Sequence, residues 1–382
     1  METLHCPAQK LHCGGCPQLS LPYPAQLEGK QKLVRSLLAP FGPVEPILGA
    51  EQPLHYRNKA IATFCGSGAR LSCGIYEAHT HRVIPAEHCL LQDERINEVL
   101  KAVLAAARAC RYDAFDEDEG TGLLRHVVVR RGVRTGQISV AVVTPSAFLP
   151  GSKKFVALLR AACPDVVTVV QNINPRRTSA VLGSTEKVLF GSGCLEDELC
   201  GQRFLISTRA FYQVNPVQTE RLYRTALDFA ALTGRETVLD AYCGIGTIAL
   251  AAAPQAKAVL GVELNSDAVA NARRNAALNH AKNASFRVGD AGAVMAQAAA
   301  LGQRADVVFL DPPREGASEQ FLRALLQSRP GRIVYISCGP QSLARDLALL
   351  TAGGYRLQRA QPVDMFPHTD HVETVVMMER HK

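Results

Sequence analysis

The second half of the chain alternates short hydrophobic runs with helix-forming segments, and this rhythm constrains the fold more than any other feature. After Arg203 the runs are TVLDAYCG, AVLGVELN, ADVVFLDPP, RIVYISCGP and VETVVMMER. Near-continuous hydrophobic strands of this kind belong to sheets that helices cover on both faces. The sequence therefore predicts a doubly wound, Rossmann-like α/β domain over residues 203–382.

Residues 1–202 show a different pattern. After a cysteine-rich start, an amphipathic basic helix is expected from Tyr23 to Leu38. Short β-branched runs then lie between Tyr56 and Cys200, with helices near 93–109 and 153–162. We predict an N-terminal α+β domain, from which residues 20–50 could extend to pack on the C-terminal domain.

Composition narrows the class of protein only broadly. A chain of 382 residues with 47% hydrophobic and 20% charged residues can bury two cores. It contains no apolar run near the ~20 residues of a membrane span, and its start does not resemble a signal peptide. We expect a cytoplasmic monomer without an obligate protein partner. The net charge of +7 suits an approach to phosphates but also an ordinary solvated surface.

A glycine turn follows the first strand of the C-terminal domain. It is contained in Asp240-Ala-Tyr242-Cys-Gly244-Ile-Gly246-Thr and precedes the helix-forming run IALAAA. Glycines at such a turn let the backbone approach a ligand closely. The next strand ends at Glu263, whose carboxylate can hold ribose hydroxyls. By itself the turn also fits a plain strand-to-helix connection or a dinucleotide enzyme.

Two later strand ends favour a methyltransferase. Asp290 follows the third strand, and the rigid corner Asp311-Pro312-Pro313-Arg314 ends the fourth. Such a corner can place a methyl acceptor beside the sulfonium of S-adenosylmethionine, which we expect as cofactor. A dinucleotide oxidoreductase would need a third glycine in the turn. A nitrogen methyltransferase would usually carry an aromatic residue where Arg314 stands.

A cysteine and a glutamate near the C-terminus are candidate catalytic groups. Cys338 ends a strand and precedes Gly339 and Pro340, which opens a helix, so we expect a lowered thiol pKa. The alternative interpretation is that Cys338 is a small, buried hydrophobic residue without a catalytic role. Glu373 begins the last strand, where its carboxylate could act as a base or simply be solvated. A metal site formed by His368, His371 and Glu373 is a weaker alternative.

Six motifs resemble, in order, those of the RNA uracil-5-methyltransferases: FYQVNPVQTE, LDAYCGIGTI, GVELN, LDPPREG, YISCGPQSLARDL and DMFPHTDHVETV. The resemblance implies that Cys338 is the nucleophile and Glu373 the base. The implied cofactor and target-base residues are Gln213, Tyr242, Gly244, Glu263, Asp290 and Asp311. Gly339 departs from the family, which commonly has asparagine after the nucleophile, and lacks that side chain's hydrogen bond.

The chemistry of this family explains why both groups are required. Carbon 5 of uracil is too weak a nucleophile to attack a sulfonium methyl group unaided. A thiolate that adds to carbon 6 places electron density on carbon 5. After methyl transfer, a base must remove the carbon 5 proton before the thiol can leave.

Four cysteines point to a branch within the family. Cys6, Cys13, Cys16 and Cys89 resemble the 4Fe-4S ligands of the branch that methylates 23S ribosomal RNA. Four thiolates could also hold zinc. The tRNA-modifying branch usually lacks this set and remains an alternative, as does a non-catalytic iron-sulfur RNA-binding protein.

The RNA-binding surface is expected on the central domain. The sequence starts without the small β-barrel (TRAM domain) of longer members of the family, so another surface must hold the RNA. Basic residues on and after one strand are the candidates, although each could be ordinary surface charge. These residues are Arg125, Arg130, Arg131 and Arg134, with Arg176 and Arg177 elsewhere.

Overall fold

The computed structural model describes residues 4–77, 80, 82–85, 88–176 and 180–381. Within these residues no helix is long and apolar enough to cross a membrane. The chain divides into two compact units. The first contains residues 1–20, 52–198 and 205–209, and the second contains residues 21–51, 199–204 and 210–382.

The first unit is an α+β fold built on a mixed seven-stranded sheet of order β3-β2-β1-β4-β5-β6-β7. Only β5 and β6 pair in parallel, and helix α3 connects them. The strands are β1 (Lys59–Cys65), β2 (Ser72–Tyr76), β3 (Val83–Pro85), β4 (His126–Arg131), β5 (Ile138–Thr144), β6 (Val166–Ile173) and β7 (Thr185–Phe190). The helices are α2 (Glu94–Ala109) and α3 (Ser152–Ala162), with short 3-10 turns at Pro7–Leu11 and Gly68–Arg70.

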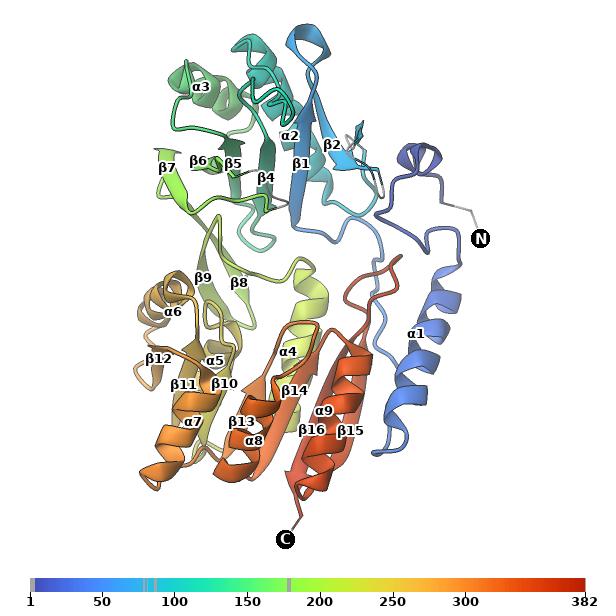
Figure 1. Cartoon of the computed structure of the whole chain (residues 1–382), viewed down its shortest axis with the longest axis vertical. Coiled ribbons are helices and arrows are strands. Elements are labelled where there is room, and N and C mark those ends of the chain that lie inside the picture. Colours follow the sequence, from blue (N-terminus) through green and yellow to red (C-terminus); the bar gives the residue numbers. More distant parts are fainter. Residues whose placement is uncertain (1–3, 78–79, 81, 86–87, 177–179, 382) are drawn as a thin grey trace. The chain divides into compact units, whose positions relative to one another are not determined.

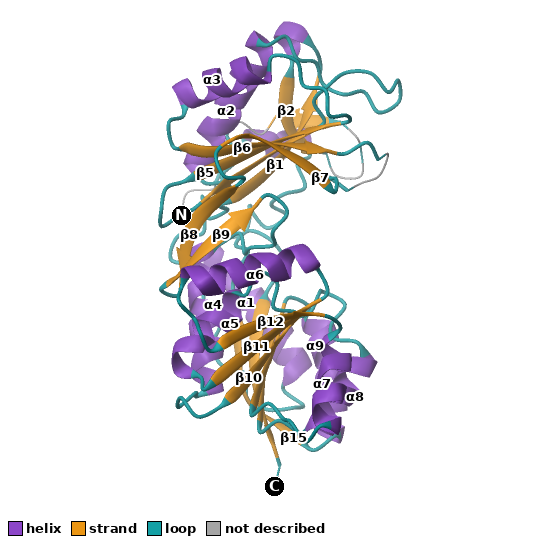
Figure 2. Ribbon diagram, turned by 90° about the vertical axis from the view of Figure 1, so that its left-hand side faces the viewer, coloured by secondary structure: helices purple, strands orange, loops and turns teal. Residues whose placement is uncertain are grey.

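Both helices of this unit cover one face of the sheet (Figure 2). Helix α2 begins at the N-cap Asp93, whose carboxylate accepts a hydrogen bond from the Arg95 N–H at 2.9 Å. Its buried stripe, which includes Ile96, Val99 and Val103, packs on alternate residues of β1, β4 and β5. This packing forms the core of the first unit.

A two-stranded hairpin lies where the chain passes from the first unit to the second. It pairs β8 (Cys194–Leu199) with β9 (Gln202–Ser207). Cys200 and Gly201 form its turn, both with positive φ, at 51° and 74°. Two consecutive residues with positive φ suit the right-handed twist of a tight hairpin.

The second unit is the doubly wound α/β domain that the sequence predicts. Its sheet has the order β12-β11-β10-β13-β14-β16-β15, and only β16 is antiparallel to its neighbours. The strands are β10 (Thr237–Ala241), β11 (Ala258–Glu263), β12 (Ala284–Val288), β13 (Val307–Leu310), β14 (Arg332–Ser337), β15 (Tyr355–Val363) and β16 (Glu373–Arg380). The strand order reverses between β10 and β13, where open α/β sheets bind their ligands.

Helices cover both faces of this sheet (Figure 2), with α4, α5 and α6 on one side and α7, α8 and α9 on the other. Their bounds are α4 (Pro216–Ala230), α5 (Thr247–Ala252), α6 (Ser266–Leu278), α7 (Ala291–Ala300), α8 (Glu319–Ser328) and α9 (Pro340–Ala352), and a 3-10 turn at Ala253–Gln255 follows α5. The hydrophobic strands β10, β13 and β14 at the centre of the sheet are buried because helices cover both of its faces there, whereas the edge strand β12 is partly exposed.

An N-terminal segment completes the second unit. Helix α1 (Tyr23–Leu38) lies beside α9 and β15 (Figure 1), and its Val34 and Leu38 are fully buried in the core of this unit. The chain then runs along β15, where the Leu48 N–H donates to the Pro362 carbonyl at 2.9 Å. Residues 21–51 therefore group with the C-terminal domain in space.

Candidate functional site

The glycine turn lies at the carboxyl end of β10. Tyr242, Gly244 and Gly246 all have positive φ, at 66°, 54° and 86°. A Cβ on Gly246 would lie 2.9 Å from the ring of Phe286, so this position requires glycine on two grounds. The turn leaves backbone amides facing the end of the sheet, where the Gly244 N–H donates to the Glu263 carboxylate at 3.2 Å.

Acidic residues follow three strands around this turn: Glu263 at the end of β11, Asp290 after β12 and Asp311 after β13. Glu263 ends β11 and also accepts from the Asn265 N–H at 2.9 Å. Asp290 caps α7 by accepting from the Ala293 N–H at 2.8 Å. Its charge faces Tyr242, whose pKa rises to about 12 mainly through burial and partly through Asp290. The structure therefore brings Gly244 to Glu263 and Tyr242 to Asp290, four of the residues that the sequence predicts for the cofactor.

Asp240 and Tyr223 contact helix α5, which follows this turn. Neither residue was predicted as part of the site. Asp240 is buried at 0% exposure and accepts from the Ala249 N–H at 2.8 Å. Burial raises its pKa well above the usual value. The Tyr223 hydroxyl lies 3.2 Å from the Thr247 hydroxyl, close to the charges of Asp311 and Asp240. Nothing local marks Tyr223, because its partners come from other helices and strands, such as Thr247 of α5.

Cys338 and Glu373 lie opposite each other at the end of the sheet. Strands β14 and β16 are antiparallel, and Ser337 pairs with Thr374. Cys338 follows Ser337 and Glu373 precedes Thr374, so the same register places Cys338 opposite Glu373. Their charges interact, and each also interacts with Asp311 and Arg314. The structure thus joins the DPPR corner, the cysteine and the glutamate in one cluster.

Burial dominates the ionisation of this cluster. It raises the pKa of Glu373 to about 8, with a further contribution from the charge of Asp311. It raises the pKa of Asp311 to about 7. It also raises the pKa of Cys338 to about 11, and the Glu373 and Asp311 charges add to this effect while Arg314 opposes it. The expected lowering of the Cys338 pKa is therefore wrong, because burial and two carboxylates outweigh the helix N-terminus.

Glycine at position 339 allows a close approach of two loops. A Cβ there would lie 2.6 Å from the Arg314 carbonyl oxygen and 2.6 Å from the Ser342 hydroxyl. The Ser342 hydroxyl instead donates to the Arg314 carbonyl at 2.8 Å. The absence of a side chain thus lets α9 hold the loop after Asp311 directly.

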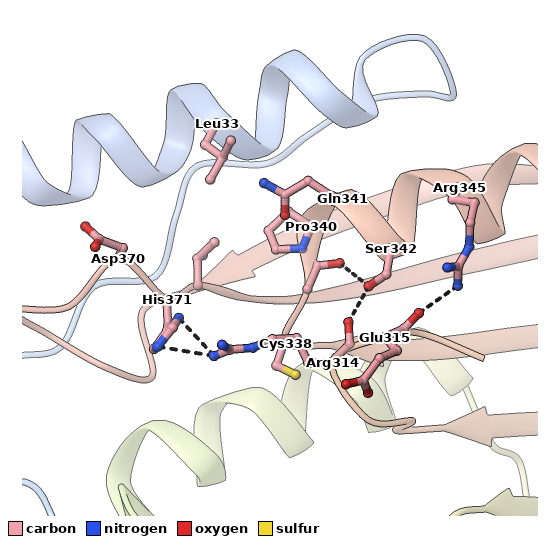
Figure 3. Close-up of a pocket in the computed structure, with 12 residues that line it drawn as sticks. Leu33, Arg314, Glu315, Cys338, Pro340, Gln341, Ser342, Arg345, Asp370 and His371 are labelled. Carbon is pink, nitrogen blue, oxygen red and sulfur yellow. Dashed lines mark hydrogen bonds between the residues drawn. The ribbon is translucent and has the colours of Figure 1, made fainter. Parts of the chain in front are cut away.

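A cavity of about 680 Å³ opens on the cysteine side of this cluster (Figure 3). Arg314 points toward His371, and its Nη2 lies 3.1 Å from the imidazole nitrogens. The residues around the cavity also include Leu33, Arg345 and Asp370. Cys338 therefore lines a cavity whose charged residues are of both signs, with Arg314 and Arg345 balanced by Glu315 and Asp370.

The FYQVN segment leads into α4 beside this cluster. Gln213 is 8% exposed, and Asn215 caps α4 by accepting from the Gln218 N–H at 3.3 Å. Phe211, by contrast, is 71% exposed. An aromatic side chain left in solvent two residues before Gln213 is a candidate surface for stacking a base. Phe211 is not among the predicted site residues, although an aromatic residue beside the predicted Gln213 was an available sequence signal.

The four N-terminal cysteines line one cavity of about 380 Å³ in the first unit, together with Arg57, Ile75 and Leu90. Burial and the charges of Cys89, Cys13 and Cys6 raise the pKa of Cys16 to about 12. In the part of the chain that the structure describes, no three His, Cys, Asp or Glu side chains are arranged around a single metal ion.

The arginine surface expected on the central domain is formed only in part. Arg125 is 4% exposed and donates to the Asn174 and Arg176 carbonyls at 2.7 and 2.6 Å. Arg130 is 2% exposed, and Arg131 pairs with Asp93 at 2.6 Å. Arg125 and Arg130 are therefore held inside the domain, and the prediction of a basic surface patch is wrong for these two. Arg131 is partly exposed, and Arg134 and Arg176 are exposed as predicted. Arg177 lies outside the described residues.

The fold and this site define a class of protein. A doubly wound sheet, a glycine turn at its switch point and acidic residues after three strands are the features of S-adenosylmethionine-dependent methyltransferases. The class accounts for the glycine turn after β10 and for the acidic residues after β11, β12 and β13.

Comparisons with known proteins define the family. The profile of the family described as tRNA (uracil-5-)-methyltransferase matches residues 186–381. RNA methyltransferases of Halalkalibacterium halodurans and Enterococcus faecalis are 45% and 41% identical over 372 residues, each covering 96% of this chain and 81% of the relative. The chain belongs to the RNA uracil-5-methyltransferase family, and it is an S-adenosylmethionine-dependent enzyme of that family.

A solved structure agrees over nearly the whole chain. The tRNA (uracil-54, C5)-methyltransferase of Pyrococcus abyssi, in complex with S-adenosyl-L-homocysteine, superposes with a TM-score of 0.82. The two proteins are 27% identical, and the match covers 96% of this chain and 86% of that one.

Proposed function

We propose that this enzyme methylates carbon 5 of a uridine in 23S ribosomal RNA, with Cys338 as the covalent nucleophile and Glu373 as the base. The observation that carries the catalytic assignment is the facing position of these two residues at the ends of β14 and β16. Asp311 and Arg314 share their cluster and would orient the uracil.

Each residue has a defined step. The Cys338 thiolate forms a bond to carbon 6, and the electron pair of the 5,6 double bond becomes an enolate. The methyl group is then supplied by the sulfonium of S-adenosylmethionine, which leaves as the neutral thioether. Glu373 takes the carbon 5 proton, the double bond re-forms, and the Cys338–carbon 6 bond breaks to return the thiolate.

In the free protein, Cys338 and Glu373 are in their protonated, unreactive forms. Raised pKa values of about 11 for Cys338 and about 8 for Glu373 keep both groups protonated near neutral pH. A bound sulfonium would bring a positive charge to a site that contains the acidic groups of Cys338, Glu373 and Asp311. That charge stabilises the thiolate and the carboxylates, so cofactor binding is expected to prime the reaction.

We also propose that Cys6, Cys13, Cys16 and Cys89 hold a 4Fe-4S cluster. Thiolates on one zinc ion lie within about 4 Å of each other, since each Zn–S bond is ~2.3 Å. The described cysteines do not form such a group, yet all four line a single cavity of about 380 Å³. Thiols spaced around a cavity fit a cluster of several atoms better than one ion. Such a cluster would cross-link the segment of Cys6, Cys13 and Cys16 to Cys89 within the first unit.

The cysteine set is the reason for preferring ribosomal RNA. A tRNA uridine is the second candidate, because the profile and the Pyrococcus abyssi protein carry that activity in their descriptions. Mapping 5-methyluridine by mass spectrometry in 23S ribosomal RNA and in tRNA, from cells with and without the protein, decides between them. Loss of a 23S site, restored by the wild type but not by Cys338→Ala, supports the proposal, whereas loss confined to tRNA overturns it.

A further inference from the structure

A buried polar network joins helix α1 to the loop of residues 364–372, which precedes Glu373. Lys30 donates from Nζ to Asp364 Oδ1 at 2.6 Å, and both side chains are nearly inaccessible, at 2% and 0%. The Tyr23 hydroxyl donates to the other oxygen, Asp364 Oδ2, at 2.8 Å. Lys30 also donates to the Phe366 carbonyl at 3.1 Å.

Gln26 binds the same loop one turn earlier on α1. Its Oε1 accepts from the His368 backbone N–H at 2.9 Å, and its Nε2 lies 3.1 Å from His368 Nδ1. His368 has a φ of 66°, in the left-handed region that favours glycine. The two contacts from one side chain stabilise this strained backbone, and Gln26 and His368 are each 1% exposed.

Helix α4 holds the loop from another side. Asn215 donates to the Met365 carbonyl at 3.0 Å, and Gln218 donates to the Asp364 carbonyl at 3.0 Å. At its two ends the loop is closed by the β15–β16 pairing, in which Val363 faces Glu373. Asp364 is thus one residue from the strand partner of Glu373.

The Glu373 carboxylate depends on this support. It is 4% exposed, and within the described residues its Oε2 has no hydrogen-bond partner. A carboxylate that no donor orients takes its position from the backbone that carries it. The geometry points to α1 as a positioning element: Gln26 and the Lys30–Asp364 pair hold loop 364–372 so that Glu373 faces carbon 5 of the bound uracil. This inference rests on the proposed function.

The test separates the early steps of the cycle from release. On RNA that carries 5-fluorouracil at the target, the base has no carbon 5 proton to remove, so the cycle stops at the methylated Cys338 adduct. The rate of adduct formation on this RNA therefore reports only the steps before Glu373. Multiple turnover on ordinary RNA reports all steps, and the ratio of the two isolates proton removal.

Gln26→Leu removes both contacts to His368 without burying a charge. We expect adduct formation on 5-fluorouracil RNA within twofold of the wild type, with turnover on ordinary RNA lowered on the order of tenfold to a hundredfold. A methylated adduct should accumulate on ordinary RNA. The matched control is Gln31→Leu on the same helix, because Gln31 contacts the Glu45 carbonyl and the Ile47 N–H instead. It should leave both rates unchanged.

A second variant covers the case in which Gln26→Leu does not fold. Lys30→Met combined with Asp364→Asn replaces the buried ion pair by neutral groups of similar size, a change that proteins often tolerate. It should show the same selective loss of release. Equal losses on both RNAs, unchanged turnover, or failure of both variants to fold would overturn the positioning role.

Glu373→Gln distinguishes this inference from the function on which it rests. If Glu373→Gln accumulates the adduct and the α1 variants do not, only the positioning role fails. If Glu373→Gln turns over ordinary RNA normally, Glu373 is not the base, and the proposed function itself must be revised.

Discussion

Cys338 and Glu373 face each other across two antiparallel strands, because Ser337 of β14 pairs with Thr374 of β16. The insertion of β16 between β14 and β15 creates this relationship. A nucleophile and a base on adjacent strand ends can act on the two neighbouring carbons of one uracil ring. The pairing of β14 with β16 thereby sets the distance between the nucleophile that adds to the ring and the base that allows its release.

Glu373→Gln should arrest the cycle after methyl transfer. The amide keeps the shape of the site but cannot take the carbon 5 proton, so turnover should fall on the order of 10²–10⁴-fold. Denaturing electrophoresis should reveal a protein–RNA adduct that carries label from the methyl donor. Cys338→Ala is the control, and it should bind RNA and S-adenosylmethionine but form neither adduct nor product. Activity in Cys338→Ala would exclude the covalent mechanism.

Release should depend on pH through Glu373. Its pKa is raised to about 8, mainly by burial, so the base is protonated at neutral pH and gains activity as pH rises through about 8. Single-turnover release rates between pH 6 and about 9 measure this rise. A flat profile would show that Glu373 does not limit the step.

The same ionisation should appear in stability. The folded protein holds the Glu373 proton more tightly than the unfolded chain, whose carboxyl pKa is ordinary. The associated stability is therefore present below the unfolded pKa of about 4.3 and is lost as pH rises through about 8. Thermal unfolding of the free protein should show a falling midpoint over this interval, and a smaller fall in Glu373→Gln. An identical pH dependence in the two proteins would contradict the assignment.

Gly339→Asn should displace the loop that carries Asp311. The new Cβ would meet the Arg314 carbonyl at 2.6 Å, and backbone at that distance must move. We expect adduct formation to slow on the order of tenfold or more, since small displacements of reacting groups are costly. Gly331→Asn is the control, because its Cβ meets only the Asp306 carbonyl at 3.4 Å. Wild-type rates for Gly339→Asn would show that the loop adapts.

Protein purified without oxygen should be brown and contain about four irons per chain, as a 4Fe-4S site requires. Cys16→Ser should lose the iron and destabilise the first unit, because Cys16 lines the cysteine cavity. Cys110→Ser, outside that cavity, should keep the iron. Stoichiometric zinc without iron would contradict the cluster.

Local sequence patterns were sufficient for much of the site. The hydrophobic rhythm after Arg203 predicts the strands, and the glycines at 244 and 246 predict the turn, because both depend on residues close in sequence. Glu263, Asp290 and Asp311 follow directly, since the carboxyl ends of parallel strands meet at one edge of a sheet.

The sequence by itself thus determined the doubly wound class, the turn and the residues at the strand ends. Only the tertiary structure decided that Cys338 has a raised pKa, that Arg125 and Arg130 are buried, and that α1 belongs with the second unit. The reason is physical: burial and electrostatic interactions depend on neighbours brought from distant parts of the chain. Lys30 and Asp364 are 334 residues apart in sequence, yet they form one buried ion pair beside the proposed base.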